Sequence, residues 1–269
     1  MSTQPPSEAS PTPDLQRSLV GVLDLTTLEA TDTAERVQDL CARGLDPLGD
    51  GSATVGAICV YPTMVPAAAE ALAGSAVKLA SVAGAFPSGM SPLHLRVAEA
   101  AWCVQQGATE IDMVISRGEF LAGRRQPIEQ EVGEIRDAIG NARLKVILET
   151  GELETADNIR HASELVVPLL REGDFIKTST GKIQPAATLE AAEVMLGVLA
   201  EAWRTGGPKI GLKPAGGVRT AEDAMAYWSL ALGAMAGHAE WEHPDPRYFR
   251  IGASSLLGSL ADAIGQGPR

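Results

Sequence analysis

Eight short apolar runs, rich in β-branched residues, alternate with segments of helical periodicity along almost the whole chain. The apolar runs cover residues 19–25, 54–61, 77–83, 110–115, 144–149, 174–178, 209–213 and 249–253. The helical segments cover residues 33–43, 65–74, 92–106, 129–141, 155–171, 188–206, 221–232 and 254–264. Strict alternation of this kind predicts an α/β fold with a parallel sheet covered by helices.

The count of eight units favours a single closed (β/α)8 barrel, the TIM barrel, over an open doubly wound sheet. The length of 269 residues is close to the roughly 250 that such barrels need. An open sheet that binds a dinucleotide should carry G-x-G-x-x-G after its first strand, where this chain has DLTTL at residues 24–28. We therefore expect one barrel domain over residues 15–269, preceded by a disordered tail over residues 1–14 that is rich in Ser, Thr and Pro.

Charge and composition argue against several classes of binding partner. The formal net charge is −12, which argues against binding nucleic acid or anionic lipid through a broad basic surface. No apolar stretch approaches the roughly 20 residues that a transmembrane helix needs, and the first residues lack the features of a signal peptide. Three cysteines without a C-x-x-C pair fit reduced thiols, and four scattered histidines give no zinc spacing. We expect a cytoplasmic protein with neither nucleic-acid nor membrane partners.

Two lysines end consecutive predicted strands. Lys177 lies in the segment DFIKTSTGK and Lys213 in the segment KIGLKPAGG. Taken alone, either lysine has the alternative of being a solvated surface charge, as most lysines are. Adjacent barrel strands are only about 4.8 Å apart, however, so two inward-pointing lysines at neighbouring strand ends lie within each other's field.

Such a pair predicts covalent chemistry. Two close ammonium groups with partial desolvation lower the pKa of one lysine from about 10.4 toward neutrality. A fall of roughly three units corresponds to about 4 kcal/mol, which a desolvated neighbouring cation can supply. The free amine then attacks a carbonyl and forms an iminium, which serves as the electron sink that a metal would otherwise provide.

Three further reactive side chains fall at predicted strand ends, each with a structural alternative. Asp112 stands inside an apolar strand, where it is either a counter-ion to a lysine or a proton carrier acting through water. Asp24 is followed by two threonines, so a helix-cap or turn role competes with a place in the site. Cys59 is either reactive or an inert buried thiol.

Glycine-rich segments after the last three predicted strands indicate an anion site. Backbone N–H groups beside glycine can approach a ligand closely, and the start of the terminal helix favours an anion. Barrels often hold phosphate at this position. The candidate residues are Gly181 and Lys182 after the sixth strand, Gly216 and Gly217 after the seventh, and Gly252, Ser254 and Ser255 around the end of the eighth.

Several segments together resemble the deoxyribose-phosphate aldolase family. They include DLTTL at residues 24–28, EID at 110–112, FIKTSTGK at 175–182 and KPAGG at 213–217, and the correspondence extends in order over about residues 18–264. The resemblance implies a class I aldolase, without a metal or other cofactor, on a TIM barrel. Its expected partners are small molecules: 2-deoxy-D-ribose 5-phosphate, cleaved reversibly to acetaldehyde and D-glyceraldehyde 3-phosphate.

The resemblance also implies roles for individual residues. Lys177 matches the Schiff-base lysine, Lys213 the neighbour that lowers its pKa, and Asp112 the proton-relay carboxylate. The expected substrate-binding residues are Asp24, Thr26, Cys59, Thr178, Gly181, Lys182, Gly216, Gly217, Gly252, Ser254 and Ser255. The sequence does not fix the oligomeric state, for which a homodimer is the expectation.

The chain departs from the family pattern in two places, and two rival functions remain. The chain ends in GQGPR without the C-terminal tyrosine of some relatives, so proton transfer would depend on Asp112 and water. The segment 241–246 matches nothing in the family and is expected only to lengthen an outer loop.

One rival function is that of a metal-dependent barrel enzyme using Asp24, Asp112 and Glu149 as ligands. The other is a non-catalytic sugar-phosphate sensor.

Overall fold

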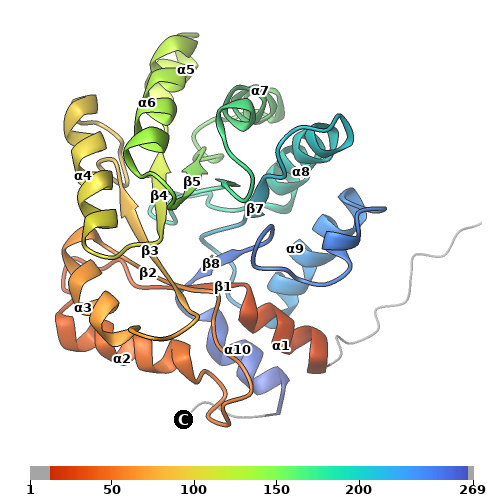
Figure 1. The fold of residues 1–269 in the computed structure, drawn as a ribbon. Helices are drawn as coiled ribbons and strands as arrows, with labels where there is room; N and C mark the ends of the chain where they lie inside the picture. Colours follow the sequence, from red (N-terminus) through yellow and green to blue (C-terminus); the bar gives the residue numbers. More distant parts are fainter. Residues whose placement is uncertain (1–12, 266–269) are drawn as a thin grey trace, which may run out of the picture.

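The computed structural model describes residues 13–265, and at its centre is a barrel of eight parallel strands (Figure 1). The strands are β1 (Leu23–Thr26), β2 (Ala57–Val60), β3 (Lys78–Ala83), β4 (Glu110–Val114), β5 (Arg143–Ile147), β6 (Phe175–Lys177), β7 (Gly211–Lys213) and β8 (Ile251–Ala253). They pair in the order β7-β6-β5-β4-β3-β2-β1-β8. Parallel bridges from Leu212 to Phe249 and from Ala215 to Gly252 join the two edges. The predicted TIM barrel is confirmed.

Helices surround the barrel. They are α1 (Pro13–Gly21), α2 (Ala34–Leu45), α3 (Val65–Ala71), α4 (Leu93–Gln105), α5 (Arg117–Leu121), α6 (Arg125–Ala138), α7 (Ala156–Val166), α8 (Leu189–Arg204), α9 (Ala221–Ala234) and α10 (Leu256–Ala263), with 3-10 turns η1 (Pro62–Met64), η2 (Val167–Leu169) and η3 (Ala239–Trp241). Four of them begin after a threonine whose hydroxyl accepts the backbone N–H three residues on: Thr33, Thr155, Thr188 and Thr220. Over residues 13–265, no helix has the length and apolar character required to cross a bilayer.

The start of the chain differs from the sequence prediction. Because α1 begins at Pro13, residues 13 and 14 are helical rather than part of a tail, and residues 19–21 belong to α1 rather than to the first strand. Leu19 and Val20 are fully buried, so the apolar run that suggested a strand is the inward face of a helix. Figure 1 shows α1 beside α10. The predicted disorder of residues 1–12 lies outside the described residues, as does the segment 266–269.

Smaller differences concern element ends. The short helix α5 was not predicted, and α6 begins at residue 125 rather than 129. The predicted helix over 155–171 is α7 followed by η2, where Pro168 stands among the first residues of the turn. The predicted helix over 254–264 begins at residue 256, which leaves two serines in the loop after β8.

The prediction that the segment 241–246 only lengthens an outer loop is wrong. Trp241 is 1% exposed, and its ring stacks on Trp228 with centroids 6.2 Å apart. The carbonyl of Pro246 accepts hydrogen bonds from Arg143 at 3.2 Å and from Arg250 at 2.6 Å. Arg143 is the first residue of β5 and Arg250 directly precedes β8, so the segment holds two arginines at the end of the barrel where the strands begin.

The barrel interior has an apolar part and a charged part. β2 and β3 contribute small residues, Ala57, Cys59, Ala80 and Val82, which cluster with Leu28. Strands β1, β4, β5, β6 and β7 direct charged side chains inward. Because side chains alternate along a strand, cross-strand partners such as Lys177 and Lys213 leave the sheet on the same face. The helices cover the outer face of the sheet with the main hydrophobic core.

Candidate active site

A cavity of about 740 Å³ opens where the strands end, which is the face on which barrels build active sites. Many of the predicted site residues line it. They are Thr26, Lys177, Gly181, Lys182, Gly216, Gly217, Gly252, Ser254 and Ser255. Further lining residues that the sequence analysis did not single out include Arg36, Arg43, Thr180, Gln184 and Arg219.

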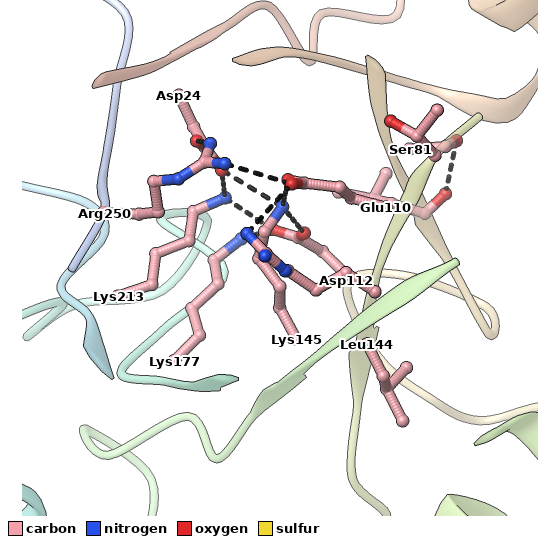
Figure 2. Close-up of polar contacts among 12 residues, drawn as sticks. Asp24, Ser81, Glu110, Asp112, Leu144, Lys145, Lys177, Lys213 and Arg250 are labelled. Carbon is pink, nitrogen blue, oxygen red and sulfur yellow. Dashed lines mark hydrogen bonds and ion pairs between the residues drawn. The ribbon is translucent and has the colours of Figure 1, made fainter. Parts of the chain in front are cut away.

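The three residues expected to carry catalysis meet at the floor of this cavity. The Nζ atoms of Lys177 and Lys213 donate to the same oxygen of Asp112, at 2.6 Å and 2.7 Å (Figure 2). Asp112 and Lys213 are fully buried, whereas Lys177 keeps 3% of its surface exposed and lines the cavity. Among residues 13–265, the amine that meets both the cavity and the buried charges is therefore that of Lys177.

The surroundings shift the pKa values of the two lysines in opposite directions. Burial lowers the pKa of Lys177, and the neighbouring Lys213 lowers it further, against the opposing effect of Asp112. Burial also acts to lower the pKa of Lys213, but the carboxylates of Asp112 and Asp24 outweigh burial and raise it. Lys213 therefore keeps its proton, and Lys177 is the lysine disposed to lose one.

Asp24 belongs to this buried group and not to a turn. Its carboxylate accepts hydrogen bonds from Lys213 and, at 2.6 Å, from Arg250. The turn after β1 is instead held by Asp32, which accepts from the Thr27 hydroxyl at 2.9 Å. The alternative of a cap or turn role for Asp24 is therefore wrong.

Asp24, Cys59 and Thr178 were expected to bind substrate, and none of the three lines the cavity. Cys59 is 1% exposed among small apolar side chains, and burial raises the pKa of its thiol. The inert alternative therefore fits Cys59. Thr178 follows Lys177 directly, so alternation along the chain turns its side chain the other way. Its hydroxyl accepts the backbone N–H of Ala215 at 3.0 Å and ties neighbouring loops together.

The predicted anion-binding segments converge on one side of the cavity. Gly181, Gly216 and Gly217 all have positive φ, and a Cβ on Gly216 would lie 2.8 Å from the Cα of Gly181. Ser255 precedes α10 without a side-chain cap, so its hydroxyl does not compete for the first N–H groups of the helix. The Lys182 ammonium group contacts Glu29 at 3.4 Å across the cavity mouth. These loops together line one side of the cavity.

A family model of the DeoC/LacD family aldolases matches residues 19–243. The chain belongs to this family. It is therefore an aldolase, an enzyme of the lyase class.

Named relatives are similar in sequence to this chain over most of its length. The deoxyribose-phosphate aldolase of Mus musculus is 43% identical over 258 residues, which cover 91% of this chain and 79% of the relative. The human deoxyribose-phosphate aldolase is 42% identical with the same coverage. A crystal structure described as a deoxyribose-phosphate aldolase from Coccidioides immitis superposes with a TM-score of 0.73 at 29% identity, covering 90% of this chain and 85% of that one.

The carboxylates required by the metal-dependent alternative are not assembled as a ligand set in this aldolase. Asp24 and Asp112 are each held by lysine ammonium groups. Glu149, at the start of the loop after β5, accepts instead from the backbone and hydroxyl of Thr180. In the part of the chain that the structure describes, no group of three or more His, Cys, Asp or Glu side chains is arranged to hold a metal ion.

Sequence reasoning missed three charged residues of the aldolase interior. Lys145 on β5, Glu110 on β4 and Arg250 just before β8 are at most 2% exposed. Lys145 pairs with Asp112 and Arg250 with Asp24, and Glu110 pairs with both Lys145 and Arg250. A usable signal was present, because Glu110 stands two residues before Asp112. Charged residues at a spacing of two within an apolar strand share one face of the sheet.

Proposed function

We propose that this aldolase reversibly cleaves 2-deoxy-D-ribose 5-phosphate to acetaldehyde and D-glyceraldehyde 3-phosphate through a Schiff base on Lys177. The observation that carries the proposal is the contrast between the lysines. The Lys177 amine lines the cavity with a lowered pKa, while Lys213 is fully buried behind it with a raised pKa. A desolvated lysine next to another cation is a typical activated amine.

The substrate class follows from the cavity and from the relatives. The curated relatives named above are deoxyribose-phosphate aldolases. The loops around Gly181, Gly216 and Ser255 offer backbone N–H groups to a phosphate, while Lys177 lies on the floor of the same cavity. An open-chain sugar held by its phosphate at these loops can extend its aldehyde toward the lysine. The sugar phosphate is thus bound at one end and activated at the other.

The reaction is balanced by proton transfers around the amine. The neutral Nζ of Lys177 adds to the C1 aldehyde to give a carbinolamine, whose hydroxyl takes up a proton and leaves as water, giving an iminium. A base removes the proton of the C3 hydroxyl, the C2–C3 bond breaks, and its electron pair passes into the iminium to form an enamine. D-Glyceraldehyde 3-phosphate leaves, C2 takes up a proton, and water releases acetaldehyde from Lys177.

Asp112 is the proposed proton carrier for these transfers, acting through water. Burial alone would raise the pKa of Asp112, but Lys145, Lys177 and Lys213 outweigh burial and hold the pKa well below its usual range. The carboxylate therefore stays ionised and accepts hydrogen bonds. When Lys177 becomes an iminium, its hydrogen bond to Asp112 changes, and the carboxylate can orient a water molecule toward the reacting carbons.

Chemical trapping tests the proposal directly. Acetaldehyde with borohydride is expected to leave an N-ethyl group on Lys177, identified by peptide mass spectrometry, because only an unprotonated accessible amine forms the reducible imine. The buried Lys145 and Lys213 serve as internal controls and should remain unmodified. Modification at another lysine, or at none, would overturn the assignment.

The phosphate site is tested by a charge placed in its wall. The variant Ser254→Asp is expected to raise the KM for 2-deoxy-D-ribose 5-phosphate by about tenfold or more, because its carboxylate repels the phosphate. The matched variant Ser254→Asn has nearly the same shape without the charge, and its KM should stay close to that of the wild type. Unphosphorylated 2-deoxy-D-ribose should not distinguish the two variants. Equal KM values for the phosphorylated substrate in both variants would contradict this placement.

A further inference from the structure

Six of the buried charged side chains form a closed ring of alternating sign, called here the ionic ring (Figure 2). Its three cations and three carboxylates follow one another in the order Arg250, Glu110, Lys145, Asp112, Lys213, Asp24 and back to Arg250. The contacts Arg250–Glu110, Glu110–Lys145 and Lys145–Asp112 measure 3.0, 2.6 and 2.9 Å. The contacts Asp112–Lys213 and Asp24–Arg250 measure 2.7 and 2.6 Å, and Lys213 donates to Asp24.

The ionic ring is neutral when its members carry their usual charges, and Lys177 stands outside it. Lys177 touches the ring at one carboxylate oxygen of Asp112, which Lys213 already occupies at 2.7 Å. A proton on Lys177 would therefore add an unmatched positive charge to a buried site, and low-dielectric surroundings disfavour such a charge. Removing one ring cation would leave a carboxylate in excess, which a protonated Lys177 could then balance.

Arg250 and Glu110 lie at the end of the barrel where the strands begin, since Glu110 is the first residue of β4 and Arg250 directly precedes β8. Both are 2% exposed, and neither lines the cavity. Arg250 is fixed from behind by the carbonyl of Pro246 at 2.6 Å. Neither residue can touch a molecule bound in the cavity, so any effect on the reaction must pass through the ring.

The remaining ionisable groups around Lys177 do not alter this balance. Cys59 faces it from β2, but burial raises the pKa of the thiol, which stays neutral. Lys145, on β5, is itself a ring member. Arg143 contacts Glu110 at 3.4 Å from outside the ring, and 24% of its side chain remains exposed to solvent. The charges that determine the protonation of Lys177 are therefore those of the ring.

We propose that Arg250 and Glu110 are positioning residues that complete a neutral ionic ring and thereby keep Lys177 a free amine. The inference rests on the proposed function, since it concerns the protonation of the Schiff-base lysine. It assigns the barrel end opposite the cavity a part in the chemistry. It also gives the segment 241–246 a role through its hold on Arg250.

Charge-changing variants test the proposal, because the proposal expects two of them to shift the pH dependence of Lys177 modification in opposite directions. The measured quantity is the midpoint pH of the rate at which acetaldehyde and borohydride modify Lys177. Arg250→Gln leaves the ring one charge too negative, which favours the protonated lysine and should raise the midpoint by about one pH unit. Glu110→Gln leaves it one charge too positive and should lower the midpoint by a similar amount, about one unit.

The variant Arg250→Lys separates charge from shape. It keeps the positive charge but loses the planar group that bridges two carboxylates, so its midpoint should stay near that of the wild type. A purely structural role of Arg250 would affect the lysine and glutamine variants alike. If Arg250→Gln does not fold, as judged by circular dichroism, the nearly isosteric Glu110→Gln is sufficient for the test. A lower midpoint pH in Glu110→Gln supports the proposal, and an unchanged or higher midpoint contradicts it.

The outcomes separate this inference from the proposed function. Failure of the wild type to form an adduct on Lys177 at any pH would refute the proposed function. An adduct on Lys177 whose midpoint is unchanged in Glu110→Gln, or moves upward, would refute the ring while leaving the Schiff base intact. Opposite shifts in the two glutamine variants, with Arg250→Lys near the wild type, would support the ring.

Discussion

Replacing Lys177 by methionine is expected to lower kcat/KM for 2-deoxy-D-ribose 5-phosphate by on the order of 10⁴-fold or more, because it removes the amine that forms the iminium. Lys182 also lines the cavity, but its ammonium group contacts Glu29 at the mouth and lacks the desolvated, cation-flanked setting of Lys177. Lys213 cannot substitute, since it is fully buried and pairs with two carboxylates. Steady-state assays with each purified variant, coupled to detection of D-glyceraldehyde 3-phosphate, measure the loss. Residual activity within tenfold of the wild type would exclude the proposed nucleophile.

The same variant is expected to be at least as stable as the wild type. Lys177 is 3% exposed and has a lowered pKa, so it places a desolvated amine where an apolar side chain of similar length would fit. Replacing a buried ionisable group by a well-packed apolar one is often neutral or stabilising by about 1–4 kcal/mol. The midpoint of urea unfolding measures this effect. A variant that is both inactive and strongly destabilised would leave the loss of activity attributable to misfolding, so Lys177→Arg, which keeps a cation, provides the second comparison.

The sequence was sufficient to predict the barrel and the proximity of Lys177 and Lys213, the lysines at the C-terminal ends of two neighbouring strands. Alternation of apolar runs with helical segments has few architectural solutions, and eight repeats select the closed one. Lys177 and Lys213 each end their strand, and neighbouring parallel strands in a barrel end at similar heights. The structure aligns them as direct cross-strand partners. Their proximity follows from local position alone.

The ionic ring could not be predicted in the same way. Arg250 lies 140 residues from Glu110 and 226 residues from Asp24 along the chain. Its contacts depend on the closure of the barrel between β7 and β8 and on the segment that ends at Pro246. No periodicity in the sequence encodes that closure geometry. The α1 error had a simpler origin, because a short apolar run does not distinguish a strand from the buried face of a helix.

Replacing Lys213 by leucine is expected to cause the second large loss of activity. Lys213 donates to Asp24 and Asp112, so its loss removes one positive charge beside Lys177 and leaves two buried carboxylates less well paired. The pKa of Lys177 should then rise toward its reference near 10.4, at which fewer than about one lysine in 10³ is a free amine at pH 7. Turnover at neutral pH is therefore expected to fall by about 10²- to 10³-fold.

The pH dependence of kcat/KM tests the direction in which Lys213→Leu shifts the pKa of Lys177. The active form of Lys177 is unprotonated, so a raised pKa lowers activity at neutral pH, and activity recovers as the pH rises. For Lys213→Leu, kcat/KM should increase about tenfold per pH unit between about pH 7 and 9, where the wild type should vary much less. Lys213→Arg keeps the charge and should retain the wild-type profile even if its rate is lower. A Lys213→Leu profile parallel to that of the wild type would show that this lysine does not control the protonation of Lys177.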